Sequence, residues 1–249
     1  MVITSHMLHH ELGIDAVIAD YFANQRPVPQ QNLFWKNKLI YLYAGFGTLT
    51  IPIVFDLQNK LGIDHEQLLN NEHVLLMQQG FDLLRRFEDK MIDQKAFLQG
   101  CKDLLSGKVK QTRLAEDLFS VFSGAKPSCF PLDQTSAALS RSDMFLFTLV
   151  DLPLSDTWVT KFIPYWYAVA RPILIFDDFV DLASDRLSGE SENVIIEFGN
   201  DRHAIQKAFA LGLADVTLLA GINAKLADFM RKKLEKCLQL KYIQSQLKA

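Results

Sequence analysis

The sequence of 249 residues predicts an all-α fold, and two observations carry this prediction. Strand signals are scarce, because no Asn-Gly or Asp-Gly turn joins alternating runs and few stretches alternate with a period of two. Apolar residues instead recur at helical spacing in two long stripes, one from Leu75 to Ile92 and one from Ala208 to Met230. With 49% hydrophobic residues, the chain can bury a substantial core.

Turn-forming residues mark where the expected helices begin and end. The breaks lie near Arg26–Gln31, Gly62–Asp64, Ser106–Gly107, Ser123–Asp133, Leu152–Asp156 and Gly199–Asp201. Because no repeat or low-complexity tract divides the chain, we expect a single domain over residues 1–249 with about eight to ten helices. Residues from 1 to about 15 are expected to be disordered or to form the edge of a first helix.

One segment tests whether the chain could enter a membrane. From Leu39 to Phe55 there are 17 residues without a charge. A transmembrane helix needs about 20 such residues, and Gly45, Gly47 and Pro52 interrupt this one. A buried core helix is the preferred interpretation, and a membrane-associated helical protein is the alternative.

Charge and cysteine content exclude several classes of protein. The net charge is −3, with 26 basic and 29 acidic residues, so we expect no nucleic-acid partner. Three widely spaced cysteines form no CxxC pair, which disfavours a zinc site and indicates free thiols in a reducing, cytoplasmic compartment. The N-terminus lacks the basic and apolar regions of a signal peptide.

The most informative motif is a row of acids in the stretch ILIFDDFVDLASDRLSGESE. An apolar run leads directly into Asp177, Asp178, Asp181 and Asp185, three of which are spaced i, i+4 and i+8. Like charges at this spacing cost about 0.2–0.5 kcal/mol per pair in an isolated helix. Mg²⁺, which prefers oxygen ligands, would remove that cost. We therefore interpret these acids as metal ligands rather than as a solvated face.

A second group of acids lies in GFDLLRRFEDKMIDQ, on the first apolar stripe. Asp89 and Asp93 are spaced i, i+4, Glu88 is adjacent, and Asp82 lies two turns earlier. Together the two groups could hold metal ions that bind a polyanion such as diphosphate. Surface ion pairs with Arg85 and Arg86 explain this second group of acids equally well. A di-iron site needs Glu-x-x-His pairs, and an EF-hand needs its own loop pattern; the sequence contains neither.

The stretch IFDDFVDLASDRLSG resembles the second aspartate-rich motif of trans-prenyl diphosphate synthases, with DDxxD present as Asp177, Asp178 and Asp181. The spacing of Asp181 and Asp185 is also similar to the second acidic motif of squalene and phytoene synthases. RRFEDKMIDQ resembles a degenerate first motif, with Glu88 and Asp89 in place of two aspartates and Asp93 in a DxxxD spacing. WKNKLIYLYAG resembles the segment that carries diphosphate-binding residues, so Lys36 and Lys38 are their counterparts.

This resemblance implies the class I isoprenoid synthase fold, an all-α bundle in which two acidic motifs face each other across an apolar cavity. It implies Mg²⁺ as the cofactor and an allylic isoprenyl diphosphate as the substrate, ionised for prenyl transfer, condensation or cyclisation. Arg171, seven residues before Asp178, would contact the diphosphate or pair with a surface acid. The basic C-terminal segment, RKKLEKCLQLKYIQSQLK, would close over diphosphate, contact anionic lipid at a membrane surface, or remain solvated.

The sequence also departs from the family pattern. Ser142-Asp143 replaces an expected Lys-Thr pair, and Gly189-Glu190 replaces Gly-Lys, so at least two diphosphate-binding lysines are missing. These losses favour an alternative in which the chain keeps the fold but acts as a regulatory or partner subunit, in a heterodimer with a true synthase. The expected assembly is therefore a homodimer or a heterodimer with a synthase subunit.

Overall fold

A computed structural model describes residues 4–25, 46–88, 90–132, 136–189 and 192–248. The described residues are mostly helical and contain no strand, which confirms the all-α prediction. They divide into two compact units, which we describe separately. The specific isoprenoid synthase architecture and the single domain both stay predictions.

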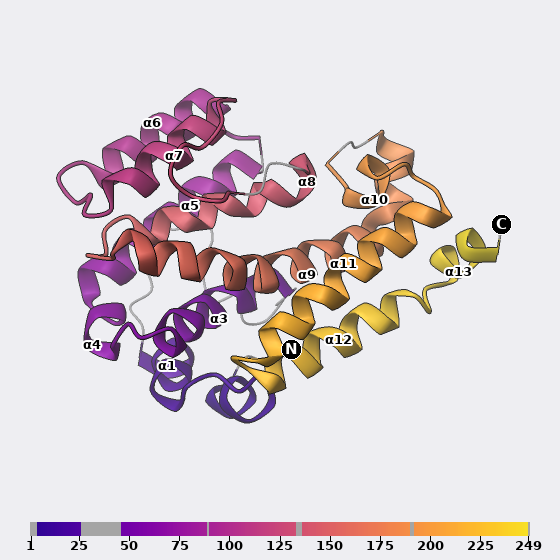
Figure 1. Cartoon of the computed structure of the whole chain (residues 1–249), viewed down its shortest axis with the longest axis horizontal. Coiled ribbons are helices and arrows are strands. Elements are labelled where there is room, and N and C mark those ends of the chain that lie inside the picture. The colour runs from indigo at the N-terminus through magenta and orange to yellow at the C-terminus, as the bar shows by residue number, and fades with distance from the viewer. Residues whose placement is uncertain (1–3, 26–45, 89, 133–135, 190–191, 249) are drawn as a thin grey trace. The chain divides into compact units, whose positions relative to one another are not determined.

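The first unit comprises Met1–Ser5, Asp15–Leu132 and Asp143–Ile163. Its helices are α1 (Ala16–Asp20), η2 (Tyr21–Gln25), α3 (Phe46–Lys60), α4 (His65–Leu68), α5 (Asn71–Glu88), α6 (Gln94–Leu105) and α7 (Thr112–Phe122), with most of η4 (Arg141–Leu149) and the start of α9 (Asp156–Ser188). Helices α5 and α6 pack against each other, as Figure 1 shows. The His73 ring on α5 lies 3.0 Å from both carboxylate oxygens of Asp151, which fixes α5 to the segment after η4.

The second unit comprises His6–Ile14, Asp133–Ser142 and Pro164–Ala249. It contains η1 (Met7–Glu11), α8 (Ala137–Ser140), most of α9, α10 (Val194–Glu197), α11 (Arg202–Ala220), α12 (Ala224–Cys237) and α13 (Lys241–Lys248). Helices α11 and α12 lie side by side, joined by a short turn (Figure 1). Gly212 allows this packing, because a Cβ there would lie 3.0 Å from Leu234 of α12 and 3.6 Å from Ile175 of α9.

Two of the predicted breaks coincide with helix ends because polar side chains cap the helices that follow, whereas the break near Arg26–Gln31 lies outside the described residues. Asp64 accepts a hydrogen bond from the Gln67 N–H at the start of α4. Asp201 accepts one from the Ala204 N–H at the start of α11. Carboxylates at this position satisfy N–H groups that have no partner within the helix. The breaks at Gly62–Asp64 and Gly199–Asp201 are therefore confirmed.

The apolar segment from Leu39 to Phe55 lies partly outside the described residues. Its described part belongs to α3, where Ile51, Ile53 and Phe55 are at most 1% exposed. Within the described residues, every helix is too short or too polar to cross a membrane.

Candidate functional site

All four acids of the second motif lie on α9, in the part of this helix that belongs to the second unit. Asp177 and Asp181 are exposed, and Asp185 is half-buried. Asp178 is buried, with only 3% of its surface accessible. Asp177 and Asp181 therefore face solvent, while the neighbouring Asp178 faces the interior beside Phe179.

Asp178 joins three segments of the second unit. One carboxylate oxygen accepts a hydrogen bond of 2.8 Å from the Arg141 guanidinium, which forms an ion pair. The other accepts a hydrogen bond of 2.7 Å from the Val194 N–H at the first turn of α10. Arg141 also donates to the carbonyl oxygen of Glu192. A carboxylate with both oxygens engaged by charge and by backbone is a strong local anchor.

Asn193 extends this anchor along α9. Its side-chain amide donates to the backbone carbonyl of Asp178 and to a carboxylate oxygen of Asp185, both at 2.8 Å. Its side-chain oxygen caps α10 by accepting from the Ile195 N–H. Asp178 and Asp185 thus hold the segment that follows α9, while Asp177 and Asp181 remain directed to solvent.

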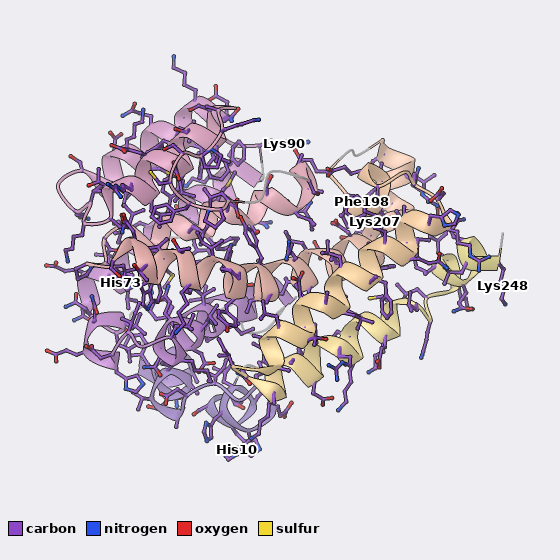
Figure 2. The ribbon with its side chains drawn as sticks, in the orientation of Figure 1. His10, His73, Lys90, Phe198, Lys207 and Lys248 are labelled. Carbon is purple, nitrogen blue, oxygen red and sulfur yellow. The ribbon has the colours of Figure 1, made fainter. Side chains whose placement is uncertain are left out.

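A cation–π contact lies directly after helix α10. The Lys207 ammonium on α11 lies 3.8 Å from the centre of the Phe198 ring, which directly follows α10 (Figure 2). Contacts of this kind contribute about 0.5–1 kcal/mol at exposed sites. The Glu197 carboxylate, at the end of α10, accepts bonds from the Ser136 hydroxyl and the Ala138 N–H beside α8.

The electrostatics of the row differ between its members. Partial withdrawal from solvent raises the pKa of Asp177, the charges of Asp181 and Asp185 raise it further, and Arg141 acts in the opposite direction. Burial raises the pKa of Asp178 to about 6, although Arg141 and the Val194 N–H both lower it. A carboxylate whose pKa is raised by neighbouring negative charges favours the approach of a cation.

The structure also shows the partner of Arg171, which the sequence predicted to contact diphosphate or an acid. Its guanidinium donates to both carboxylate oxygens of Asp215 on α11, at 2.9 and 2.6 Å. It also lies 5.1 Å from the centre of the Tyr167 ring. Asp215 is buried rather than at the surface. In this structure Arg171 therefore joins α9 to α11.

The first acidic motif belongs to the first unit. Asp82 pairs with Arg86 at 2.9 Å, which matches the ion-pair interpretation of this segment. Glu88 is the last residue of α5. Asp93 caps α6 by accepting from the Ala96 N–H at 2.8 Å. Asp89 lies outside the described residues, as do Lys36 and Lys38.

Few of these acidic side chains are available to hold a metal ion. No group of three or more His, Cys, Asp or Glu side chains that could hold a metal ion occurs in the described part of the chain. Asp178 is already engaged by Arg141, which leaves Asp177 and Asp181 as exposed carboxylates one helical turn apart. Mg²⁺ in phosphate sites is commonly bound by one or two carboxylates, with phosphate oxygens and water as the other ligands. The residues present fit that arrangement.

Two residues of this region were not predicted from the sequence. Arg141 directly precedes Ser142-Asp143, where the family resemblance expects a Lys-Thr pair, so a cation one position away was an available signal. Asn193 had no comparable signal, because its contacts with Asp178 and Asp185 depend on how the chain folds back after α9.

Comparisons with known proteins do not add to this description. No protein-family model, no curated protein and no solved structure matches the chain significantly. The fold defines the class of the chain as an all-α protein.

Proposed function

We propose that the chain is a Mg²⁺-dependent, class I isoprenoid synthase-like enzyme that ionises an allylic prenyl diphosphate. The observation that carries the proposal is the exposed pair Asp177 and Asp181, one turn apart on α9, beside the guanidinium of Arg141. Carboxylates next to an arginine combine the ligands that Mg²⁺ prefers with a donor that binds phosphate oxygens.

Each side chain has a definite task in this proposal. Asp177 and Asp181 would hold Mg²⁺, which supplies Lewis-acid stabilisation of the charge that develops on the departing diphosphate. Arg141, which is 30% exposed while it pairs with Asp178, would donate to a phosphate oxygen. Asp178 and Asn193 position Arg141 and α10. Asp185 borders the row and is already bonded to Asn193.

A second function is favoured by two ion pairs. Arg141 is engaged by Asp178, and Arg171 is engaged by Asp215. A chain that uses these arginines to stabilise its own fold could serve as a partner subunit of a true synthase without catalysis of its own. This alternative predicts that the isolated chain does not bind diphosphate.

Calorimetric titration with inorganic pyrophosphate, with and without Mg²⁺, separates the two functions. The enzyme proposal expects saturable binding that requires Mg²⁺ and weakens at least tenfold in the Asp177→Asn/Asp181→Asn protein. Asparagine preserves side-chain shape while removing the two charges. The matched control is Glu235→Gln, which removes an exposed charge from α12 in the same unit and should bind like the wild type.

A positive result justifies an assay for pyrophosphate release from geranyl, farnesyl and geranylgeranyl diphosphates. Absence of Mg²⁺-dependent binding in the wild-type protein would refute the enzyme proposal. Co-purification of the chain with a synthase would then support the partner-subunit function.

A further inference from the structure

Three imidazole rings gather around η1, the first helix of the second unit. His6 directly precedes this helix, and His9 and His10 lie within it. The ring centres of His6 and His10 lie 4.6 Å apart, and those of His9 and His10 lie 4.7 Å apart. His10, labelled in Figure 2, is exposed to solvent, as is His6. Residues four positions apart are neighbours on a helix surface, so the backbone itself brings these two exposed rings together.

The turn that carries these rings is held against the start of α12. The side-chain amide of Asn223 donates to the carbonyl oxygens of Leu12 and Gly13, at 3.0 and 3.2 Å. The Nδ1–H of His9 donates to the carbonyl oxygen of Ile14 at 2.8 Å. A binding group that is ordered before its ligand arrives loses less freedom on binding. The backbone that carries the two exposed histidines is therefore prepared to hold a ligand between them.

The spacing of the His6 and His10 rings fits the binding of one ion by both. Imidazole nitrogens bind Zn²⁺ at about 2.0–2.1 Å, which places the ring centres of two imidazoles on one ion about 4.5–5 Å apart. Helical zinc sites use two histidines at i, i+4 on one face in this way. The described part of the chain contains no group of three His, Cys, Asp or Glu that could hold a metal. The protein would therefore supply two ligands, and water would complete the coordination.

The charges around His10 favour the neutral ring, which is the form that binds metals. Desolvation lowers the pKa of His10, and the charges of His6, His9 and Lys225 lower it further. The Lys225 ammonium also repels a metal cation, so binding depends on bonds from the imidazole nitrogens rather than on attraction between charges. Imidazole suits Ni²⁺, Cu²⁺ and Zn²⁺, whereas Mg²⁺ prefers oxygen ligands.

We propose that His6 and His10 form a two-imidazole binding site for a divalent transition-metal ion of the Ni²⁺, Cu²⁺ and Zn²⁺ group. This site shares no residue with the carboxylates and arginine of the proposed enzyme, and its ligands select a different class of ion. It can therefore bind its metal whether or not the chain binds Mg²⁺ and diphosphate.

The test is calorimetric titration of the full chain with Ni²⁺ in the presence of excess Mg²⁺. We expect saturable binding of one equivalent, weakened at least tenfold in His6→Gln and in His10→Gln. The matched control is His203→Gln, which removes an exposed histidine from α11 in the same unit and should bind like the wild type. Lys225→Gln should strengthen binding several-fold, because it removes a repelling charge. The Asp177→Asn/Asp181→Asn protein should bind Ni²⁺ like the wild type.

A second readout locates the ion without any substitution. Saturating Ni²⁺ should slow the modification of His6 and His10 by diethyl pyrocarbonate several-fold, measured by mass spectrometry, and leave His203 unaffected. Lack of saturable Ni²⁺ binding in the wild-type protein would overturn the inference. Binding that persists in both His6→Gln and His10→Gln, or that leaves the modification of these two residues unchanged, would also overturn it, because the ion would then lie elsewhere.

Discussion

Replacing Asp178 and Asp181 separately by alanine should have very different effects on stability. Asp178→Ala removes the ion pair with Arg141 and leaves the buried Val194 N–H without its acceptor. A hydrogen bond to a charged group contributes about 1.5–3 kcal/mol, and a buried unsatisfied donor costs about 1–3 kcal/mol. Because Arg141 is 30% exposed and can regain water, the full cost of breaking a buried pair, about 3–5 kcal/mol, is an upper limit. Because burial raises the pKa of Asp178 to about 6, the desolvation of its ionised form offsets part of these contacts, and we expect Asp178→Ala to lower the free energy of unfolding by about 1–3 kcal/mol.

Asp181→Ala should instead be neutral or slightly stabilising. Asp181 is exposed, and its charge raises the pKa of Asp177, which shows that the two carboxylates repel each other. Removing one member of a like-charged pair at i, i+4 gains about 0.2–0.5 kcal/mol. Alanine is also the better helix former. We expect a change of no more than about 0.5 kcal/mol.

Urea unfolding measured by circular dichroism at about pH 8 checks both values, because Asp178 is then ionised above its pKa of about 6. The two compact units can unfold in separate steps. Hydrogen exchange of peptides covering Val194–Glu197 therefore supplies the local measurement, and Asp178→Ala should accelerate exchange there. Asp178→Asn removes the negative charge but keeps the shape of the side chain, so it separates the contribution of the charge from that of packing. Equal midpoints and equal exchange for Asp178→Ala and Asp181→Ala would refute the reasoning.

Three further predictions concern other parts of the chain. Burial raises the pKa of Asp117, but three backbone N–H donors lower it below the ordinary value of an aspartate. The ionised carboxylate therefore stabilises the fold above that ordinary pKa, and this stabilisation is lost as the pH falls through the lower pKa of the folded state. Asp117→Asn should flatten the decline in the urea midpoint between about pH 5 and pH 2. Cys129 should be the single thiol that reacts rapidly with Ellman's reagent, because it is exposed. Burial raises the pKa of Cys101 to about 12 and the pKa of Cys237 to about 11, so these two thiols should react slowly. Cys129→Ser should therefore abolish the fast phase of the reaction. Gly212→Val should lower the free energy of unfolding by about 1–3 kcal/mol in the same urea assay, because even a Cβ there lies 3.0 Å from an α12 methyl group.

The all-α class and several helix boundaries were predictable because they depend on local chemistry. Helical spacing of apolar residues and capping carboxylates such as Asp64 and Asp201 act over a few residues. The roles of the individual aspartates in the acidic motif were harder to predict from the sequence. Spacing shows that Asp177 and Asp181 share a helix face, but it does not show which face is buried.

The pairing of Asp178 with Arg141 could not be deduced from spacing, because the two residues are 37 positions apart and meet only in the folded chain. A helix turns by about 100° per residue, so a shift of one position moves a carboxylate from the exposed row to the interior. Asp178, one position after the exposed Asp177, accordingly lies in the interior, as does Phe179, which is 1% exposed. The DDxxD pattern therefore contains two exposed carboxylates and one buried carboxylate that serves as an anchor.

This division determines the order in which a metal and a diphosphate can bind. Arg141 pairs with Asp178, and its charge opposes the rise in the pKa of Asp177 only in part. Arg186, also on α9, directs its donors to Asn200 and Tyr242. A free polyanion would therefore meet a locally negative surface, whereas Mg²⁺ would be attracted to it. Two carboxylates alone bind Mg²⁺ weakly, because the ion gives up its water reluctantly, and phosphate oxygens must complete its ligands. The proposed enzyme should thus bind pyrophosphate and Mg²⁺ only together, and pyrophosphate binding without the metal would contradict a site built on Asp177 and Asp181.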